Sequence, residues 1–565
     1  PLPVSAVPLR WAVRSVALGV RRVAAIKLLT VLVAIVLAAF RPRAFVWPER
    51  TPRWPSAETP VTTYTRHRAA RRPGLPVLLV LLLLAFGLRV HLLGNQELRG
   101  DEAFNYGFAQ LQPAEVIPEL ISQGDPHSPL PYLALNVWTR LAGISEFSLR
   151  YLSAVAGVLL VATLYALGRC MAGRPAGVLA AALAAVSPGL IWLAQDTRTQ
   201  YALVMLFASL ATLILVTPTR KPAVYWGLYL LACVLTVYSH YYGAFALASH
   251  GLYLWFAPGR RRDVWPWLAI GIVTAGVLGI WLVATAGSVF GAGHLADPAR
   301  PELARHITAI GRDLIIGQSL AERLARWLFL GGAALAGGGA VALVRAGRRA
   351  WAAMLVSWIL LAVYVFFLVR FSRGTFNNYY GSVVAPAWWL LIGAALAALW
   401  QGNIRRRIVA ALAVIVLAAA VLVALRHYYY DPLYSRTLGY RQVAAHLAQA
   451  AGPNDLLIVP YPDPGWNYYL RDSAVPRRML PTPGATAAET QETLAQWAAD
   501  YERLWFIPYS GWDTENIVGQ WLDYNTLTEE RTAQGRMELR AYRPLAAAEA
   551  VMGPVGRSLG DELSL

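Results

Sequence analysis

The sequence has little cysteine and few acidic residues, and each shortage excludes certain classes of protein or site. Two cysteines among 565 residues, Cys170 and Cys233, are too few for a disulfide framework, and neither lies in a metal-binding spacing. No zinc-ligand spacing, P-loop or Rossmann glycine fingerprint is present. Only 15% of the residues are charged and 57% are hydrophobic, which excludes an ordinary soluble domain.

Apolar runs of about 20 residues recur along the chain and predict a polytopic α-helical membrane protein. The mean hydropathy is +0.44, as expected for such a chain. We predict about eleven core transmembrane helices, near residues 75–93, 147–168, 175–192, 200–217, 223–239, 242–257, 264–286, 324–344, 350–370, 380–400 and 406–426.

Basic residues outnumber acidic ones by 50 to 32, giving a net charge of +18. In a soluble protein this excess would suggest a nucleic-acid partner. Here the arginines occupy every second short loop between apolar runs, so we interpret them as topology signals and expect no nucleic acid. The basic loops are then cytoplasmic. The predicted outer segments are 94–146, 193–199, the region around 240, 287–323, 371–379 and the chain after Arg426.

This topology also predicts how two short segments of the first outer loop, 94–146, lie relative to the membrane. The apolar stretch 129–143 is too short to span a membrane, and a crossing there would invert every later arginine cluster. We expect it to lie along the membrane surface, with the amphipathic piece Ala114–Ser122 as a second candidate for such a position.

Changes in composition divide the chain into four parts. Residues 1–74 are a basic N-terminal extension and cytoplasmic linker, in which 28–40 is a possible extra apolar segment. Residues 75–426 form the transmembrane module. Residues 427–545 alternate between short apolar strands, such as Asp455–Pro460 and Arg503–Pro508, and amphipathic helices, which predicts a small outer α/β domain. Residues 546–565 form a tail.

Ionisable residues cluster at the predicted outer ends of the helices. Asp101 and Glu102 follow the first helix, where a carboxylate can deprotonate or orient an acceptor hydroxyl; the alternative is a solvated loop acid. The proline-rich turn Gly124–Pro131 holds Asp125 and His127, and a histidine can bind phosphate or a metal. The alternative there is a rigid turn with an incidental histidine.

Two later loops carry similar groups. Asp196 and Arg198 lie in a very short loop ahead of Tyr201, and arginine binds phosphate through two hydrogen bonds; the alternative is a local ion pair that closes the turn. His240 and Tyr241 interrupt an apolar region, and an ionisable group at membrane depth is a functional candidate. A weaker signal of the same kind, equally typical of interfacial anchors, comprises Arg373, Asn377, Asn378, Tyr379 and Tyr380.

These motifs, in this order, resemble the integral-membrane glycosyltransferases of the GT-C type over roughly residues 75–400. The nearest families are the bacterial protein O-mannosyltransferase-like and aminoarabinose-transferase-like enzymes, of glycosyltransferase family 39/83 type. The sequence departs from their usual pattern in two places: His127-Ser128-Pro129 stands where His-Pro-Pro is common, and Asp196 stands where Glu is frequent.

The resemblance implies a polyprenyl-phosphate sugar donor, with transfer on the outer face of the cytoplasmic membrane of a bacterial cell. We expect Asp101 to be the base, supported by Glu102, and the transfer to be inverting. A divalent cation shared with Asp196 is possible, and the acceptor is a glycan, lipid or protein. The expected substrate-binding residues are Asp125, His127, Asp196, Arg198, Tyr201, His240 and Tyr241.

Two other classes of protein remain alternatives. A transporter or flippase of a lipid-linked or polyanionic envelope precursor would also be polytopic, but transporters usually carry their polar groups at the membrane midplane and in paired repeats. A non-catalytic scaffold for envelope assembly leaves the clustered acids and histidines unexplained. The helix-end position of the polar groups therefore favours the transferase.

Overall fold

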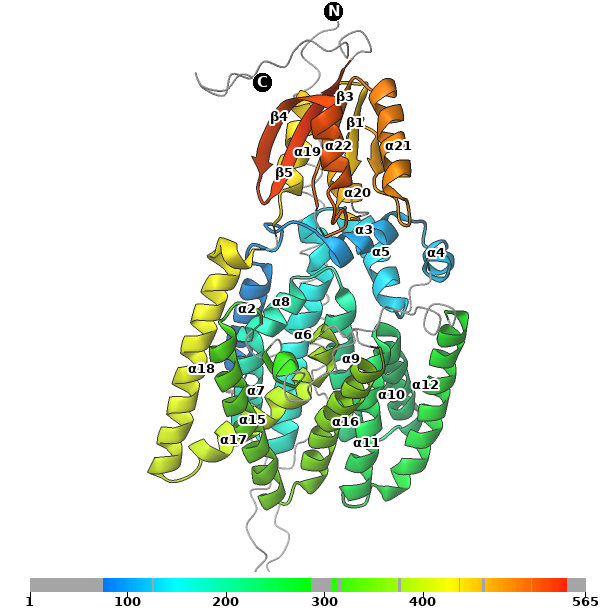
Figure 1. The fold of residues 1–565 in the computed structure, drawn as a ribbon. Helices are drawn as coiled ribbons and strands as arrows, with labels where there is room; N and C mark the ends of the chain where they lie inside the picture. The colour runs from blue at the N-terminus through cyan, green and yellow to red at the C-terminus, as the bar shows by residue number, and fades with distance from the viewer. Residues whose placement is uncertain are drawn as a thin grey trace, which may run out of the picture. The chain divides into compact units, whose positions relative to one another are not determined.

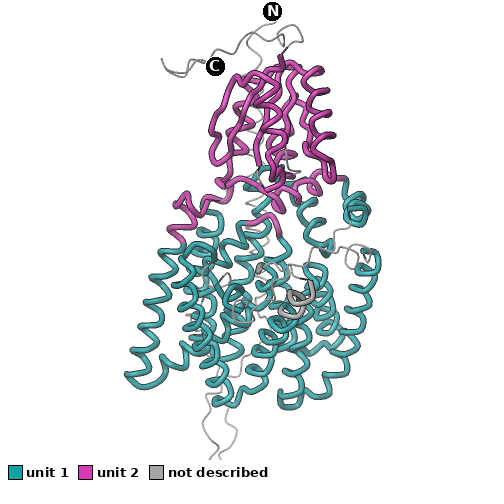
Figure 2. Tube along the Cα trace, viewed as in Figure 1, with its two compact units in different colours: residues 1–91, 112–195, 199–424 teal, residues 92–111, 196–198, 425–565 magenta. Residues whose placement is uncertain are grey.

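The computed structural model describes residues 75–123, 127–285, 307–312, 317–373, 378–435, 437–459, 463–509 and 511–545. The chain divides into two compact units, coloured separately in Figure 2. The first unit comprises 1–91, 112–195 and 199–424, and the second comprises 92–111, 196–198 and 425–565. The predicted extension 1–74, with its apolar segment 28–40, and the tail 546–565 lie outside the described residues.

The first unit is helical, as Figure 1 shows. Its described α-helices are α2 (Leu75–Val90), α4 (Val116–Ser122), α5 (Leu130–Ala142), α6 (Glu146–Ala172), α7 (Arg174–Val186), α8 (Pro188–Ala194), α9 (Thr199–Val216), α10 (Pro222–Ser239), α11 (Ala244–Phe256), α12 (Val264–Ala284), α15 (Glu322–Arg345), α16 (Arg349–Arg373), α17 (Ala385–Trp400) and α18 (Ile404–Tyr430), which continues into the second unit. Its described 3₁₀ helices are η1 (Tyr241–Gly243), η2 (Arg261–Asp263) and η3 (Asn378–Val384).

All eleven predicted membrane segments are helical, but they differ in length from the prediction. Among the described residues, eight helices are long and apolar enough to cross a membrane, or nine if α7 and α8 count as one bent span. The predicted segments 75–93 and 242–257 form α-helices of only 16 and 13 residues. The prediction of a mostly helical membrane fold is confirmed, whereas the assumption of eleven full-length helices is not.

The predicted span 175–192 is broken rather than straight. α7 ends before Ser187, and α8 begins at Pro188 with a bend of 60° between them. A proline lacks the amide hydrogen that a continuous helix needs and clashes with the preceding turn. The Ser187 hydroxyl accepts a hydrogen bond from the Leu190 amide (3.4 Å) and so caps the new helix.

Buried polar side chains bind the helix ends next to this break. Arg89, fully buried in α2, donates to the carbonyls of Ala184 (3.0 Å) and Ala185 (2.9 Å) in the last turn of α7. The Gln195 side chain donates to the carbonyls of Arg89 (3.0 Å) and His91 (2.7 Å) at the end of α2. Carbonyls at a helix C-terminus lack intrahelical partners, so these donors satisfy them and fix the ends of both helices.

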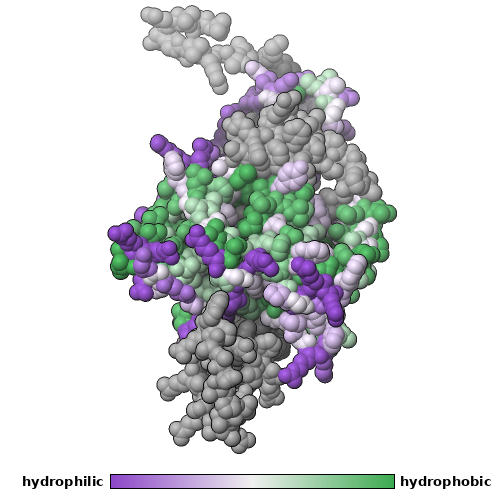
Figure 3. Space-filling model, turned by 90° about the horizontal axis from the view of Figure 1, so that it is seen from below, coloured by the Kyte–Doolittle hydropathy of each residue, from purple (hydrophilic) through white to green (hydrophobic). Residues whose placement is uncertain are grey.

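The basic loops gather at one end of the first unit. Arg348 donates to the carbonyl of Cys170 at the end of α6 (3.2 Å), and Arg260 donates to the carbonyl of Leu215 near the end of α9 (3.2 Å). Figure 3 views this end, where hydrophilic residues lie in several patches beside apolar ones. The common position of these loops is what the positive-inside interpretation requires of them.

The two short helices within residues 112–143 match the predicted segments closely. α4 covers most of Ala114–Ser122, and α5 covers 130–142 of the predicted 129–143. At 1.5 Å per residue, the 13 residues of α5 extend about 20 Å, less than the roughly 30 Å of a hydrocarbon core. α5 is therefore too short to cross the membrane as a single helix, and its position on the membrane surface stays a prediction.

The second unit contains α3 (Gly100–Gln110) and a sheet with its own helices. The remaining elements are η4 (Pro432–Tyr434), α19 (Tyr440–Ala450), β1 (Asp455–Val459), α20 (Gly465–Tyr469), β2 (Arg477–Met479), α21 (Ala487–Asp500), β3 (Arg503–Phe506), α22 (Ile517–Asn525), β4 (Thr526–Gln534) and β5 (Met537–Pro544). The sheet order is β2-β1-β3-β5-β4. β1 is parallel to β2 and β3, and β5 is antiparallel to β3 and β4.

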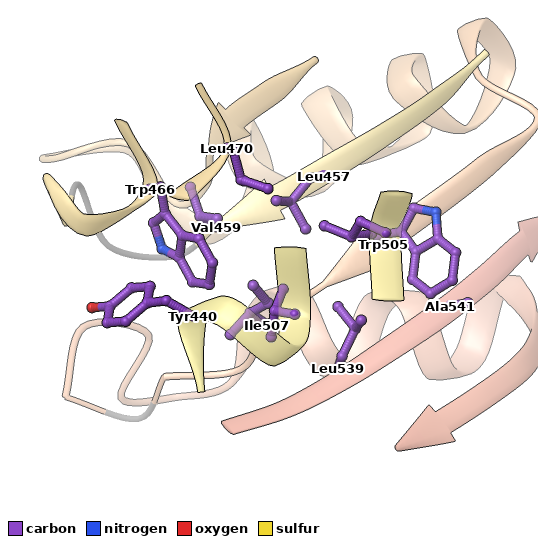
Figure 4. Packing of buried hydrophobic residues seen from close by; sticks show 11 residues of the cluster. Tyr440, Leu457, Val459, Trp466, Leu470, Trp505, Ile507, Leu539 and Ala541 are labelled. Atoms are coloured by element: carbon purple, nitrogen blue, oxygen red, sulfur yellow. The ribbon is translucent and has the colours of Figure 1, made fainter. Parts of the chain in front are cut away.

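Both faces of this sheet are covered. Every residue of β1 is buried, and after Asp455 its sequence is a continuous apolar run rather than an alternating one, as expected of a strand covered on both faces. Leu457, Val459 and Trp505 pack on one face against α19 and α20, as Figure 4 shows. Leu456, Ile458 and Phe506 pack on the other face against α21 and α22. The predicted α/β arrangement of this region is confirmed.

Candidate functional site

The first cluster of predicted site residues lies in the second unit and is called here the acidic group: Asp101, Glu102, Asp196, Thr197 and Arg198. α3 begins at Gly100, whose φ of +42° suits a glycine, and Asp101 and Glu102 occupy the first helical turn. Carboxylates are favoured there because the first amides of a helix carry partial positive charge. The Asp101 side chain is 74% exposed, whereas Glu102 is buried.

Arg198 connects two carboxylates of the acidic group. Its Nε and Nη2 donate to the two oxygens of Asp196 (3.0 and 2.7 Å), and its Nη1 donates to Oδ2 of Asp101 (3.0 Å). The Arg198 amide also donates to Asp196 Oδ1 (2.9 Å), which closes the loop on itself. The local ion pair considered from the sequence is therefore present, and the same guanidinium also holds Asp101.

Glu102 also supports this loop. Its Oε1 accepts a hydrogen bond from the Thr197 amide (3.3 Å), and the Thr197 hydroxyl donates to the Glu102 carbonyl (2.9 Å). The Asn105 side chain donates to the same hydroxyl (3.3 Å). Thr197 and Asn105 thus bind α3 to the loop, a role that the sequence did not suggest because neither residue type is distinctive.

The acidic group can offer one accessible carboxylate in a fixed orientation. Asp196 is fully buried, and both of its oxygens accept hydrogen bonds from Arg198. In the part of the chain that the structure describes, no three histidine, cysteine or acidic side chains converge as metal ligands. Both oxygens of Asp196 already accept hydrogen bonds from Arg198, so the described part of this group does not fit the divalent cation considered from the sequence.

A second cluster lies in the first unit and is called here the imidazole–tyrosine group: His127, Tyr201, His240, Tyr379 and Tyr380. The ring of His240 lies 6.1 Å from His127, 6.0 Å from Tyr201 and 5.6 Å from Tyr380, measured between ring centroids. Tyr201 also lies 6.1 Å from Tyr379. Side chains from four separate segments of the chain therefore converge.

Local hydrogen bonds explain how these segments meet. The Ser128 hydroxyl, next to His127, donates to the carbonyl of Val237 near the end of α10 (2.8 Å). The Thr199 hydroxyl at the start of α9 donates to the carbonyl of Pro131 (3.5 Å). The turn that carries His127 is thus attached both to the helix before His240 and to the helix that carries Tyr201.

His240 is buried and its tautomer is fixed by the backbone. Its Nδ1 accepts a hydrogen bond from the Tyr242 amide (3.2 Å), so in the neutral ring the proton is on Nε2. Nε2 has no hydrogen-bond partner among the described residues. Burial, and then the nearby His127, lower the pKa of His240 from 6.5 to about 3. The group therefore presents a neutral N–H donor to its surroundings.

The remaining predicted site residues have different outcomes. Asp125 lies outside the described residues, so its predicted role stays a prediction. Tyr241 is half-buried, and its ring lies 4.8 Å from His240. Tyr379 and Tyr380, which the sequence also allowed as interfacial anchors, belong to the group, and Tyr379 contacts Trp192 at 4.5 Å. In the sequence, these two residues are marked only as a pair of tyrosines at the start of a predicted helix.

Comparisons with known proteins match part of the chain to one family model. Residues 126–282 match the family model for dolichyl-phosphate-mannose-protein mannosyltransferases. That segment includes His127, Asp196, Arg198, Tyr201 and His240. No curated protein sequence matches the chain significantly.

Two solved structures of ArnT show the same fold at low sequence identity. ArnT from Cupriavidus metallidurans in the apo state is 15% identical, with a TM-score of 0.54 over 83% of this chain and 98% of ArnT. ArnT bound to undecaprenyl phosphate gives 15% identity and a TM-score of 0.52 over 84% and 98% of the two chains. An archaeal oligosaccharyltransferase from Archaeoglobus fulgidus overlaps less, with a TM-score of 0.48, 13% identity and coverage of 76% and 67%. The predicted resemblance to GT-C glycosyltransferases is confirmed.

Proposed function

We propose that this chain is a membrane glycosyltransferase that moves a sugar from a polyprenyl-phosphate donor to an acceptor hydroxyl. The observation that carries the proposal is the Asp101 carboxylate, which is 74% exposed yet held by a guanidinium that is itself fixed by a buried carboxylate. A general base must be accessible to its substrate and must keep one orientation, and Asp101 meets both conditions. The match to a polyprenol-dependent mannosyltransferase family supports the donor class.

The reaction would be a single displacement. The acceptor oxygen attacks the anomeric carbon while its proton passes to Asp101, and the bond from that carbon to the phosphate oxygen breaks. The electron pair of that bond leaves with the polyprenyl phosphate, and the configuration at the sugar carbon inverts. The developing charge on the phosphate needs hydrogen-bond donors that are already oriented, because these lower the barrier most.

Within the first unit, the imidazole–tyrosine group is our candidate for a site that binds a lipid phosphate. The buried Nε2–H of His240 is a donor without a described partner, and a phosphate oxygen would accept its hydrogen bond. Tyr201 and Tyr380 bring hydroxyl donors to the same cluster. ArnT has been crystallised with undecaprenyl phosphate, which supports a lipid phosphate as the ligand class.

Arg198 has two candidate roles in this proposal. As the sequence motif suggests, it binds the donor phosphate; as its hydrogen bonds suggest, it orients Asp101. The further proposals are that the reaction takes place on the outer face of the cytoplasmic membrane, and that the acceptor is a glycan, lipid or protein. Segment 94–146 and the sheet region would then be extracytoplasmic.

The decisive experiment incubates the purified protein with a panel of polyprenyl-phosphate sugars and measures release of polyprenyl phosphate by mass spectrometry. We expect release from one donor class, and none from the Asp101→Asn variant. If reconstituted protein moves a lipid-linked substrate across vesicles without cleaving it, the transporter alternative replaces this proposal.

A further inference from the structure

A buried carboxylate outside the acidic group, Glu97, joins the segment before α3 to the start of α19. Its Oε2 accepts hydrogen bonds from the backbone amides of Leu438 (2.9 Å), Gly439 (2.8 Å) and Tyr440 (3.2 Å), and its Oε1 accepts one from Arg441 (2.7 Å). Glu97 is fully buried, so this contact is shielded from water.

Glu97 supplies the cap that α19 lacks in its own sequence. α19 begins at Tyr440, and its N-cap residue is Gly439, which has no side chain to accept these hydrogen bonds. The first amides of a helix have no intrahelical acceptor, and the helix dipole favours a negative charge beside them. A carboxylate 341 residues earlier in the sequence than Leu438 fills this place, so the contact is tertiary rather than local.

At the same junction, a side chain of α19 also donates hydrogen bonds to the backbone of the segment before α3. The Arg441 guanidinium donates to the carbonyls of Gly94 (3.0 Å) and Asn95 (2.7 Å) in the segment before α3. Next to Glu97, the Leu98 amide donates to the Tyr469 hydroxyl (2.6 Å). The backbone before α3 is therefore held from both sides by α19 and α20.

α3 itself is attached to the same helices. The rings of Tyr106, in the middle of α3, and Tyr468, in α20, meet edge to face at 4.9 Å, and Tyr106 is buried. Asp101 lies four residues after Glu97 and five before Tyr106. Both contacts with the sheet region thus flank the carboxylate that the proposed reaction uses.

We infer that Glu97 is a positioning residue: it makes the C-terminal α/β region set the orientation of α3 and hence of Asp101. This inference rests on the proposed function, because it gives Asp101 the role of base. Displacement of a catalytic group by about 1 Å costs up to roughly 100-fold in rate, so a residue that only holds the helix can control turnover.

The test compares Glu97→Gln with Glu489→Gln in the full-length protein. The Glu97→Gln change turns an NH₂ group toward backbone amides that need an acceptor, which loosens the junction. We expect kcat to fall about 10-fold or more with little change in the donor KM, and hydrogen exchange in α3 to rise. Glu489 caps α21 in the same region through Thr486 but makes no described contact with α3, so its variant should retain normal turnover and normal exchange in α3.

A double-mutant cycle separates this role from a general loss of stability. If Glu97 acts through Asp101, Glu97→Gln should add no further loss on the Asp101→Asn background. Arg441→Gln, which weakens the junction from its other side, should reproduce the kcat defect if Glu97→Gln fails to fold. Normal kcat in a folded Glu97→Gln variant, or an equal defect in Glu489→Gln, overturns the inference. Normal turnover of Asp101→Asn overturns the proposed base instead.

Discussion

At the residue scale, each candidate side chain is defined by what holds it. Asp101 lies in the first turn of α3 with its side chain 74% exposed, and it is oriented because Arg198 donates a hydrogen bond to it. Arg198 is in turn fixed by Asp196, which is fully buried. Substitution of any one of these three residues therefore changes the hydrogen bonds of the others, and variants must be chosen so that these effects can be separated.

Asp101→Asn should lower turnover by at least about 100-fold, because the amide keeps the shape of the side chain but cannot accept the acceptor proton. The measurement is polyprenyl phosphate release, with unfolding temperature and gel filtration as controls for folding. Turnover close to that of the unmodified protein would exclude Asp101 as the base.

Arg198→Lys should behave as a non-conservative change. Lysine cannot reach both oxygens of Asp196 and also Asp101, since it has one nitrogen where arginine has three. If Arg198 binds the donor, the donor KM rises while the acceptor KM is little changed. If it only orients Asp101, kcat falls while both KM values stay near normal.

A double variant resolves the remaining ambiguity at Arg198. In Asp196→Asn/Arg198→Gln both charges are removed, so no unpaired buried charge is left behind. A purely structural pair predicts that this double variant is milder than Arg198→Ala. Unaltered donor kinetics in Arg198→Lys would defeat the phosphate-binding role.

His240→Phe should raise the donor KM by roughly 10- to 100-fold, which corresponds to about 1.5–3 kcal/mol for a hydrogen bond to a charged group. Phenylalanine keeps the ring but removes the Nε2 donor. His446→Phe, in the sheet region, is the matched control for loss of an imidazole. A donor KM equal to that of the control would remove His240 from the phosphate site.

The same variant should also change how the stability of the folded protein depends on pH. The pKa of His240 is lowered from 6.5 to about 3 in the folded protein, so below pH 6.5 the unfolded chain binds a proton that the folded chain does not. The buried neutral ring of His240 therefore lowers no stability above pH 6.5, whereas the free energy of unfolding falls progressively as the pH drops from 6.5 toward 3. His240→Phe should flatten the fall in unfolding temperature between pH 7 and pH 5.

At the scale of elements, the connections between helices and strands are set by a few backbone positions. Gly439, just before α19, has a φ of +129°, and a Cβ there would lie 1.9 Å from the carbonyl oxygen of Gln534. Gly484 also has a positive φ, of +82°, but a Cβ there would meet nothing within 4 Å. A comparison of alanine variants at these two glycines therefore separates the cost of backbone strain from the cost of a steric clash.

Gly439→Ala should destabilise the sheet region by roughly 3 kcal/mol, because strain and a backbone clash act together. Gly484→Ala should cost about 1–2 kcal/mol from backbone strain alone. The measurement is unfolding of the purified protein in detergent, followed by tryptophan fluorescence. Equal losses in the two variants would mean that the Gln534 carbonyl moves away at little cost.

At the scale of the whole molecule, the proposed topology makes one demand that labelling can test. Gln123 and Asn467 are both exposed, and the topology puts both outside the cell, whereas Arg348 lies in a basic loop. In a background with Cys170→Ser and Cys233→Ser, an impermeant thiol reagent should label Gln123→Cys and Asn467→Cys from outside, but Arg348→Cys only after permeabilisation. Labelling of Gln123→Cys and Asn467→Cys from opposite sides would refute the topology.

The sequence by itself determined the membrane class, the helical segments and the identity of most candidate residues. Length and apolarity define a membrane helix, and an uninterrupted apolar run defines a buried parallel strand such as β1; both are local properties. Asp101, Arg198 and His240 were found because ionisable groups are rare between apolar runs.

Only the tertiary structure decided how these residues are paired. The sequence showed Arg198 beside Asp196, but the bond to Asp101 joins residues 97 positions apart. Glu97 gave no signal at all, because an acid in a polar loop is ordinary until a distant helix start is folded onto it. Local patterns fix periodicity and burial, whereas hydrogen bonds between distant segments depend on the packing of the whole chain, which no window of sequence contains.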